Sequence, residues 1–168
     1  RHTGAGNGDE EMKELLITGA WRCGEQQVQA LEQMGYVVTF WPDERQAVNM
    51  DTQRFEAVIC GGLFLTTPIE RFPALKCIQV TSAGLDRVPL DYCTAHGITV
   101  YNAGGVYSAP MAEFVLGGIL QLYKESKFFA ENQAAHRWEK HRGLRELSGK
   151  TACIIGTGSV GSAIARRL

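Results

Sequence analysis

The sequence predicts an α/β fold in two units, and two features of the chain support this prediction. Short apolar runs alternate with stretches of helical periodicity from about residue 14 onward, as in a mostly parallel sheet covered by helices on both faces. Near the other end, a glycine-rich turn follows a further apolar run. The 168 residues, 45% hydrophobic and 21% charged, suffice for one ordinary globular domain and part of another.

The first unit is expected to contain a sheet. Its predicted strands cover residues 15–17, 36–40, 57–60, 77–80 and 98–101. Gly35 fits the C-terminal stop of the first helix, Thr67 resembles an N-cap followed by a proline, and Pro89 should open another short helix. Strands and helices that alternate in this way predict a flavodoxin-like doubly wound domain over residues 12–101.

The remaining segments have different roles. Residues 1–11 hold glycines and acids but nothing to bury, so they are expected to form a flexible tail, and their glycine run lacks the preceding strand that a phosphate loop needs. Residues 102–168 should contain a long linker helix with Ser108 as its N-cap. That helix is too apolar to lie free on a surface, so it should pack between structural units or against a partner.

The strongest chemical signal is the glycine turn. Residues 151–155 are predicted to form a buried strand, and a G-x-G-x-x-G sequence leads from it into a helix. Gly156 allows a tight turn, Gly158 lets the backbone approach a pyrophosphate, and Gly161 permits close packing of helix on strand. The candidate cofactor-binding residues are Gly156, Thr157, Gly158, Ser159, Val160 and Gly161. The alternative is a purely structural turn, as we expect for residues 18–24.

Composition excludes several other functions. The net charge of −1 gives no overall field that would favour nucleic acid, and no apolar run is long enough to span a membrane. His136 and His141 do not share a helical face, so no metal site is expected. The cysteines are odd in number, without a C-x-x-C pair, and mostly among apolar neighbours, which predicts buried reduced thiols and a cytoplasmic location. They are Cys23, Cys60, Cys77, Cys93 and Cys153.

Four segments, at residues 75–86, 96–103, 109–113 and 147–151, carry a family resemblance. In this order, with the glycine turn after the last of them, they resemble the D-isomer-specific 2-hydroxyacid dehydrogenase family, which includes phosphoglycerate, glyoxylate/hydroxypyruvate and D-lactate dehydrogenases. The resemblance implies a flavodoxin-like substrate domain and the start of a Rossmann domain for NAD or NADP. Substrate would meet the nicotinamide in the cleft between them.

The resemblance also implies site residues. The loop Ser82, Ala83 and Gly84 would hold the substrate carboxylate through backbone N–H groups, although the plain alternative is a glycine that ends a strand. Tyr107 would approach the substrate and Met111 the nicotinamide, although many relatives carry threonine or serine in place of Met111. The catalytic arginine, carboxylate and acid/base histidine of the family would lie beyond the glycine turn. No catalytic residue is therefore assigned.

The implied activity is hydride transfer between a nicotinamide and a small 2-hydroxy or 2-keto acid, in a protein that is a homodimer at full length. This chain would be an N-terminal fragment, inactive by itself. One alternative is an NAD-sensing binding protein of the same fold, such as a corepressor. A methyltransferase is a weaker alternative, because the preceding domain and Gly161 argue against it.

Overall fold

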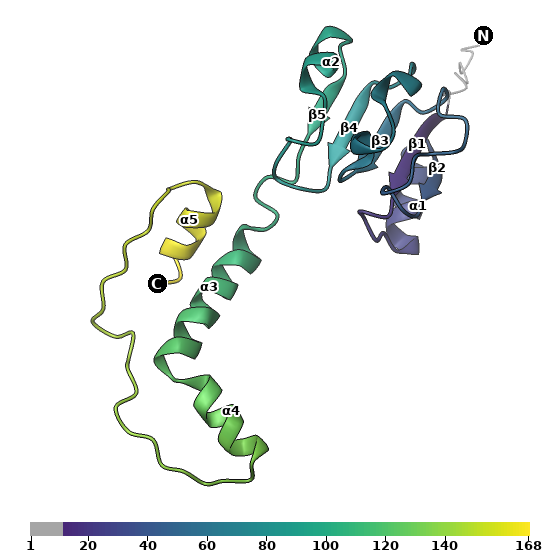
Figure 1. The fold of residues 1–168 in the computed structure, drawn as a ribbon. Helices are drawn as coiled ribbons and strands as arrows, with labels where there is room; N and C mark the ends of the chain where they lie inside the picture. Colours follow the sequence, from purple (N-terminus) through teal and green to yellow (C-terminus); the bar gives the residue numbers. More distant parts are fainter. Residues whose placement is uncertain (1–11) are drawn as a thin grey trace, which may run out of the picture. The chain divides into compact units, whose positions relative to one another are not determined.

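The computed structural model describes residues 12–168, which form two compact units that divide between Ala103 and Gly104 (Figure 1). The tail predicted for residues 1–11, with its glycine run, lies outside the described residues. Within residues 12–168, no helix combines the length and the apolar character needed to cross a membrane.

The first unit is a five-stranded parallel sheet with the strand order β2-β1-β3-β4-β5. Its strands are β1 (Lys13–Thr18), β2 (Tyr36–Trp41), β3 (Ala57–Cys60), β4 (Cys77–Val80) and β5 (Thr99–Tyr101). Each strand lies within two residues of its predicted bounds. The order reverses direction between β1 and β3, which makes this the flavodoxin-like doubly wound topology that the sequence predicts.

The core of the first unit is built on its central strands. Leu16, Val58 and Ile78 are register neighbours across β1, β3 and β4, and each is at most 1% exposed. Phe55 and Phe72, from the segments that lead into β3 and β4, belong to the same core. Burying each of these side chains stabilises the fold by about 1.5–3 kcal/mol. Because all strands are parallel, their carboxyl ends share one edge of the sheet.

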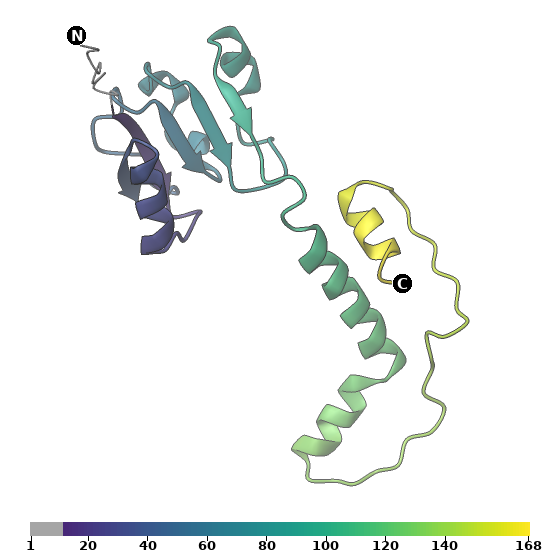
Figure 2. The same ribbon diagram turned by 180° about the vertical axis from the view of Figure 1, so that it is seen from behind.

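Two helices border this sheet. Helix α1 (Glu25–Gln33) lies against β2 (Figure 2) and is followed by Gly35 at a φ of +86°, as the predicted helix stop requires. Helix α2 (Leu90–Ala95) begins directly after Pro89, as predicted. His96 caps its C-terminal end, with Nδ1 2.9 Å from the carbonyl oxygen of Tyr92.

The prediction that Thr67 caps a helix is wrong. The segment forms two short 3-10 turns, η1 (Leu63–Leu65) and η2 (Ile69–Arg71), and neither has a side-chain cap. The Thr67 hydroxyl is buried and accepts a hydrogen bond from the backbone N–H of Val48 at 3.0 Å. A tertiary partner, 19 residues away, therefore takes the oxygen that a local cap would have used.

The second unit is built from helices. Helix α3 (Ser108–Tyr123) is followed by α4 (Ser126–Ala134), and α5 (Ser159–Ala165) packs beside α3 (Figure 1). Each of the two packed helices buries one alanine, Ala112 and Ala163, and Arg167 pairs with Glu113 at 3.6 Å. Ser108 is the first helical residue rather than the predicted N-cap, because Tyr107 holds the cap position.

The predicted strand at residues 151–155 is not formed, so this prediction is wrong for the described structure. Cys153 is exposed and Ile155 is 98% exposed, whereas burial was expected for this segment. A strand needs hydrogen-bonded neighbours, and all five strands found in residues 12–168 belong to the first unit. The predicted burial of cysteines is confirmed for Cys60 and Cys93.

Candidate functional site

The glycine turn forms a loop that ends in a helix. Gly156 has a φ of +97°, a left-handed conformation that favours glycine, and Gly158 is the N-cap of α5. The backbone N–H of Ser162 donates to the carbonyl oxygen of Gly158 at 2.9 Å, and its hydroxyl donates to the carbonyl oxygen of Thr157 at 3.0 Å. The loop is therefore tied to the first turn of the helix.

The glycines of this loop are present for different physical reasons. A Cβ atom on Gly161 would lie 2.0 Å from the carbonyl oxygen of Gly156, so helix and loop approach each other too closely for any side chain. Gly158 has an ordinary φ of −67°, and a Cβ atom there would meet no protein atom within 4 Å. The left-handed backbone explains Gly156 and close packing explains Gly161, while neither explains the glycine at 158. A ligand that occupies the space beside Gly158 would explain it.

The first glycine turn of the chain, after β1, has a different construction. The N–H of Gly19 donates to the carbonyl oxygen of Trp41 at 2.8 Å, and a Cβ atom on Gly19 would lie 2.0 Å from the carbonyl oxygen of Pro42. The backbone that follows β2 thus fills the space beside this glycine. This agrees with its interpretation as a structural turn.

The loop Ser82, Ala83 and Gly84 follows β4 at the carboxyl edge of the sheet, and its carbonyl groups are all engaged. The Ser82 oxygen accepts from the N–H of Ala103 at 2.9 Å. The Ala83 oxygen accepts from Nδ2 of Asn102 at 2.8 Å, and the Gly84 oxygen accepts from the Ser82 hydroxyl at 2.9 Å. The loop is therefore fixed through its acceptors.

The N–H groups of Ala83 and Gly84 in the same loop, in contrast to its carbonyl groups, are not engaged within the described residues. Within residues 12–168 no acceptor is found for the N–H groups of Ala83 and Gly84, and both residues are exposed. A Cβ atom on Gly84 would lie 2.8 Å from Oδ1 of Asp86, so a side chain there would displace that carboxylate. A loop that is fixed by its carbonyl groups and has exposed N–H groups can donate to an external carboxylate.

Asn102 was not among the predicted site residues. Its side-chain amide reaches across 19 residues of sequence to the carbonyl oxygen of Ala83, and no local pattern indicates this contact. Asn102 follows β5, and the loop follows β4, which is the neighbouring strand. Strand order, once known, is the signal that could have identified it.

Tyr107 and Met111 lie at the start of α3, in the second unit. The N–H of Met111 donates to the carbonyl oxygen of Tyr107 at 3.0 Å. Tyr107 is 46% exposed and Met111 is 49% exposed. The glycine loop, the loop after β4 and this helix start are each defined by their own local contacts. That these groups form a common site stays a prediction.

Cys60, at the end of β3, is the most strongly perturbed thiol. Burial, and then the nearby Glu44 carboxylate, raise its pKa to about 12. Burial also raises the pKa of Cys77 and of Cys93. These thiols stay protonated near neutral pH and therefore have no nucleophilic role. Among residues 12–168 there is no cluster of histidine, cysteine or acidic side chains suited to a metal ion.

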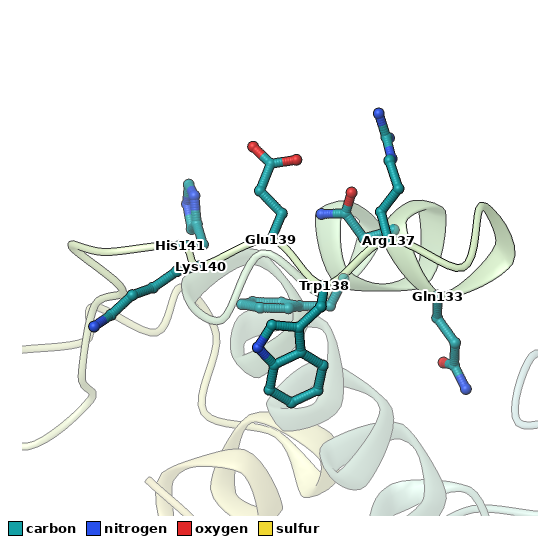
Figure 3. Close-up of a pocket in the computed structure, with 8 residues that line it drawn as sticks. Gln133, Arg137, Trp138, Glu139, Lys140 and His141 are labelled. Carbon is teal, nitrogen blue, oxygen red and sulfur yellow. The ribbon is translucent and has the colours of Figure 1, made fainter.

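A hollow of about 710 Å³ lies beside the end of α4 and the segment that follows it. Figure 3 shows that its labelled side chains do not converge, because Arg137 and Glu139 point to one side while Trp138 points to the other. A ligand site needs polar groups that meet at one point. This hollow is therefore not the candidate site.

The fold and the loops define a two-unit α/β protein in which a flavodoxin-like domain precedes a glycine loop of the dinucleotide-binding pattern. Comparison with known families agrees with this class. Residues 16–160 match the family described as "D-isomer specific 2-hydroxyacid dehydrogenase, catalytic domain". The chain belongs to this family.

Individual relatives point the same way. A glyoxylate/hydroxypyruvate reductase HPR3 from Arabidopsis thaliana is 30% identical over 115 residues, which are 66% of this chain and 36% of the relative. A glyoxylate reductase from Thermofilum pendens is 30% identical over 138 residues, which are 76% of this chain and 40% of the relative. The chain thus spans well under half the length of these curated relatives.

Solved structures support the fold. The crystal structure of a D-lactate dehydrogenase from Aquifex aeolicus, complexed with NAD and lactic acid, matches 91% of this chain and 47% of that chain, with a TM-score of 0.73 and 24% identity. An NADPH-dependent glyoxylate/hydroxypyruvate reductase from Sinorhizobium meliloti, in complex with NADP and malonate, matches 94% of this chain and 50% of that chain, with a TM-score of 0.70 and 23% identity.

Proposed function

We propose that the protein is an NAD(P)-dependent oxidoreductase that transfers a hydride between a nicotinamide and a small 2-hydroxy or 2-keto acid. The observation that supports this most directly is the open space beside Gly158, between a glycine required by its left-handed backbone and one required by close packing. Family membership supports the same activity, and relatives named glyoxylate reductase make glyoxylate and hydroxypyruvate the first substrates to test.

The proposed role of the glycine loop is to hold the pyrophosphate of the dinucleotide. The backbone at Gly158 would approach the phosphate oxygens without a Cβ atom between them, and the first N–H groups of α5 would face that charge. When it is bound, the nicotinamide supplies or accepts the hydride.

The proposed role of the loop Ser82, Ala83 and Gly84 is to hold the substrate carboxylate. The exposed N–H groups of Ala83 and Gly84 would donate to it, while Asn102 keeps the loop in place through the Ala83 carbonyl group. A fixed carboxylate leaves the neighbouring hydroxyl or keto carbon in one orientation, which is what hydride transfer requires. Tyr107 and Met111 would approach the substrate and the nicotinamide, respectively.

Gly158→Val tests the proposal directly. Its branched side chain would occupy the ligand space without meeting protein atoms at Cβ, so we expect a folded variant whose NADH affinity falls on the order of 100-fold or more. Gly118→Ala in α3 is the matched control, because a Cβ atom there also meets nothing within 4 Å. Fluorescence titration with NADH measures both. Unchanged affinity of folded Gly158→Val would contradict the assignment.

A second measurement concerns the activity itself. We expect the whole protein to oxidise NADH or NADPH with glyoxylate, hydroxypyruvate or pyruvate, and we expect residues 1–168 alone to show no turnover, since no catalytic residue is assigned within them. NADH binding without turnover by the whole protein would favour the NAD-sensing alternative. A cytoplasmic location and a homodimeric state belong to the same proposal, and a native-mass measurement tests the latter.

A further inference from the structure

The carboxylate of Glu44 lies in a cradle of donors at the carboxyl edge of the first unit. The hydroxyl of Thr18 donates to Oε2 at 2.9 Å. The N–H of Gly61 lies 3.1 Å from both carboxylate oxygens, and the N–H of Gly62 donates to Oε1 at 2.7 Å. Both oxygens of one carboxylate are thus held by two backbone amides and one hydroxyl.

No cation takes part in this arrangement. Of the ion pairs found in residues 12–168, none includes Glu44, whereas the neighbouring Asp43 is paired with Arg45 at 2.8 Å. Glu44 is therefore held by N–H and O–H donors rather than by an ion pair, although the Arg87 guanidinium lies close to Gly62, 3.7 Å from the position that a Cβ atom there would take. Charge-assisted hydrogen bonds of this kind are the means by which backbone amides bind an anion.

The cradle is also shaped for a carboxylate. Thr18 is fully buried, so its hydroxyl has a fixed surrounding. A Cβ atom on Gly61 would lie 2.9 Å from Oε1 of Glu44, so a side chain at this position would push the carboxylate out. The space beside Gly61 is thus taken by the Glu44 carboxylate together with Cβ of Ala20 at 3.1 Å and Oγ1 of Thr81 at 3.2 Å.

The position of the cradle is informative. Thr18 ends β1 and Gly61 follows β3, and the strand order reverses between these two strands. Doubly wound sheets bind their ligands at the carboxyl ends of the strands, at such a reversal. We infer that the first unit has a carboxylate-binding site at its strand-order reversal, built from Thr18, Gly61 and Gly62, and that Glu44 occupies this site from within.

One consequence concerns substrate position, and it rests on the proposed function. With Glu44 in place, the donors of the cradle are already occupied, so the exposed N–H groups of the loop after β4 remain for a substrate carboxylate. The cradle itself lies wholly in the first unit, and its test needs neither cofactor nor substrate. Its failure would leave the glycine-loop assignment untouched.

The experiment removes the internal ligand and supplies an external one. Glu44→Ala should lower the Tm of the first unit, and about 100 mM formate should raise the Tm of this variant by about 5 °C, since a ligand that binds the folded state stabilises it. Sodium chloride at the same ionic strength should have no such effect. Asp43→Ala is the matched control, because it removes a neighbouring carboxylate outside the cradle. The wild-type chain and this control should not respond to formate.

Either of two results would overturn the inference: a Glu44→Ala variant as stable as Asp43→Ala, or equal responses to formate in the variant and the wild-type chain. Glu44→Gln covers the case in which Glu44→Ala does not fold, since its amide retains one acceptor oxygen. In this variant the amide resonances of Gly61 and Gly62 should move more than those of Gly24 and Gly35. If they do not move, the amides do not bind the carboxylate.

Discussion

Gly19 and Gly158 stand in similar turns of the two units, but the space beside them differs. The position of a missing Cβ atom lies 2.0 Å from the Pro42 carbonyl oxygen at Gly19, whereas at Gly158 no protein atom is found within 4 Å. The first turn is closed by its own chain and the second is open. A glycine-rich turn therefore indicates a ligand site only when neither the backbone conformation nor the packing of the protein explains one of its glycines.

The two units also differ in how they supply negative charge. In the first unit, Glu44 fills the anion cradle at the strand-order reversal. In the second, no described side chain lies within 4 Å of the position that a Cβ atom of Gly158 would take. The unit with the closed turn has an internal anion, and the unit with the open turn is the one we propose to bind an external one.

The largest expected difference between the units is in thiol reactivity. At pH 8, burial and a pKa raised from 9.0 to about 12 should make Cys60 alkylate on the order of 1000-fold more slowly than an unhindered thiol. The exposed Cys153, near the open loop, should be modified early. Iodoacetamide labelling followed by peptide mass spectrometry measures both rates. Similar rates would show that the first unit opens readily.

The same thiol predicts a pH dependence. Below pH 9.0 Cys60 is protonated in the folded and in the unfolded chain, so it contributes no slope. Between pH 9.0 and about 12 only the unfolded chain releases the proton, and the free energy of unfolding of the first unit should fall. Cys60→Ala should flatten the curve in this range, whereas Cys153→Ala should leave it unchanged.

Gly19→Ala should cost the next largest amount. Its Cβ atom would lie 2.0 Å from a backbone oxygen, so two strand ends must separate, and the expected loss is about 3 kcal/mol of unfolding free energy. Gly24→Ala is the control, because its close contact is only the flexible end of Gln27 at 3.0 Å. Urea denaturation compares the two. Equal stabilities would mean that the first turn is not closed as described.

Gly161→Ala should have a smaller effect, about 2 kcal/mol, confined to the second unit. Its Cβ atom would lie 2.0 Å from the Gly156 carbonyl oxygen and 3.4 Å from Cγ2 of Ile154, but α5 is a short helix that can shift. Amide hydrogen exchange should show faster opening of α5 while β1 is unchanged. Unaltered exchange in α5 would contradict the close packing of loop and helix.

Gly158→Ala should have the smallest effect on stability, about 0.5–1 kcal/mol, because its Cβ atom meets no protein atom and its φ is ordinary, so that only the preference of the N-cap position for glycine over alanine is lost. The variant can be compared directly with Gly19→Ala, for which a large loss of unfolding free energy is expected. Urea denaturation of the two variants side by side is the measurement. A loss as large as that of Gly161→Ala would show that the loop at 158 is closed by the protein after all.

Much of the fold could be predicted from local sequence. The apolar runs located the strands because β1, β3 and β4 bury their apolar residues at the centre of the sheet, with β2 and β5 at its edges, and Gly35 marked a helix end through its own backbone. The strand predicted at 151–155 failed because a strand also depends on partners, which no pattern within the segment can supply. The helix cap predicted at Thr67 failed for a related reason, since its hydroxyl accepts a hydrogen bond from the N–H of Val48 rather than from a local helix.

The candidate sites could likewise be predicted only where their residues are close together in the sequence or where the family resemblance pointed to them. The glycine loop could be found because its residues are adjacent in sequence, and the family resemblance drew attention to Ser82, Ala83 and Gly84. Glu44 gave no signal, since its donors lie 17, 18 and 26 residues away. The hydrogen bond from Asn102 to the carbonyl oxygen of Ala83 likewise joins residues that are 19 positions apart in the sequence. Contacts of this kind follow from strand order.

The unpaired segment at residues 151–155 has a consequence for synthesis on the ribosome. Every strand of the first sheet lies between Lys13 and Tyr101, so the sheet can assemble as soon as this stretch has left the exit tunnel. Residues 151–155 emerge later, with Ile155 98% exposed in the folded chain, and pair with no strand among residues 12–168. We expect this exposed apolar segment to be recognised by chaperones that bind extended apolar chain for as long as it stays unpaired.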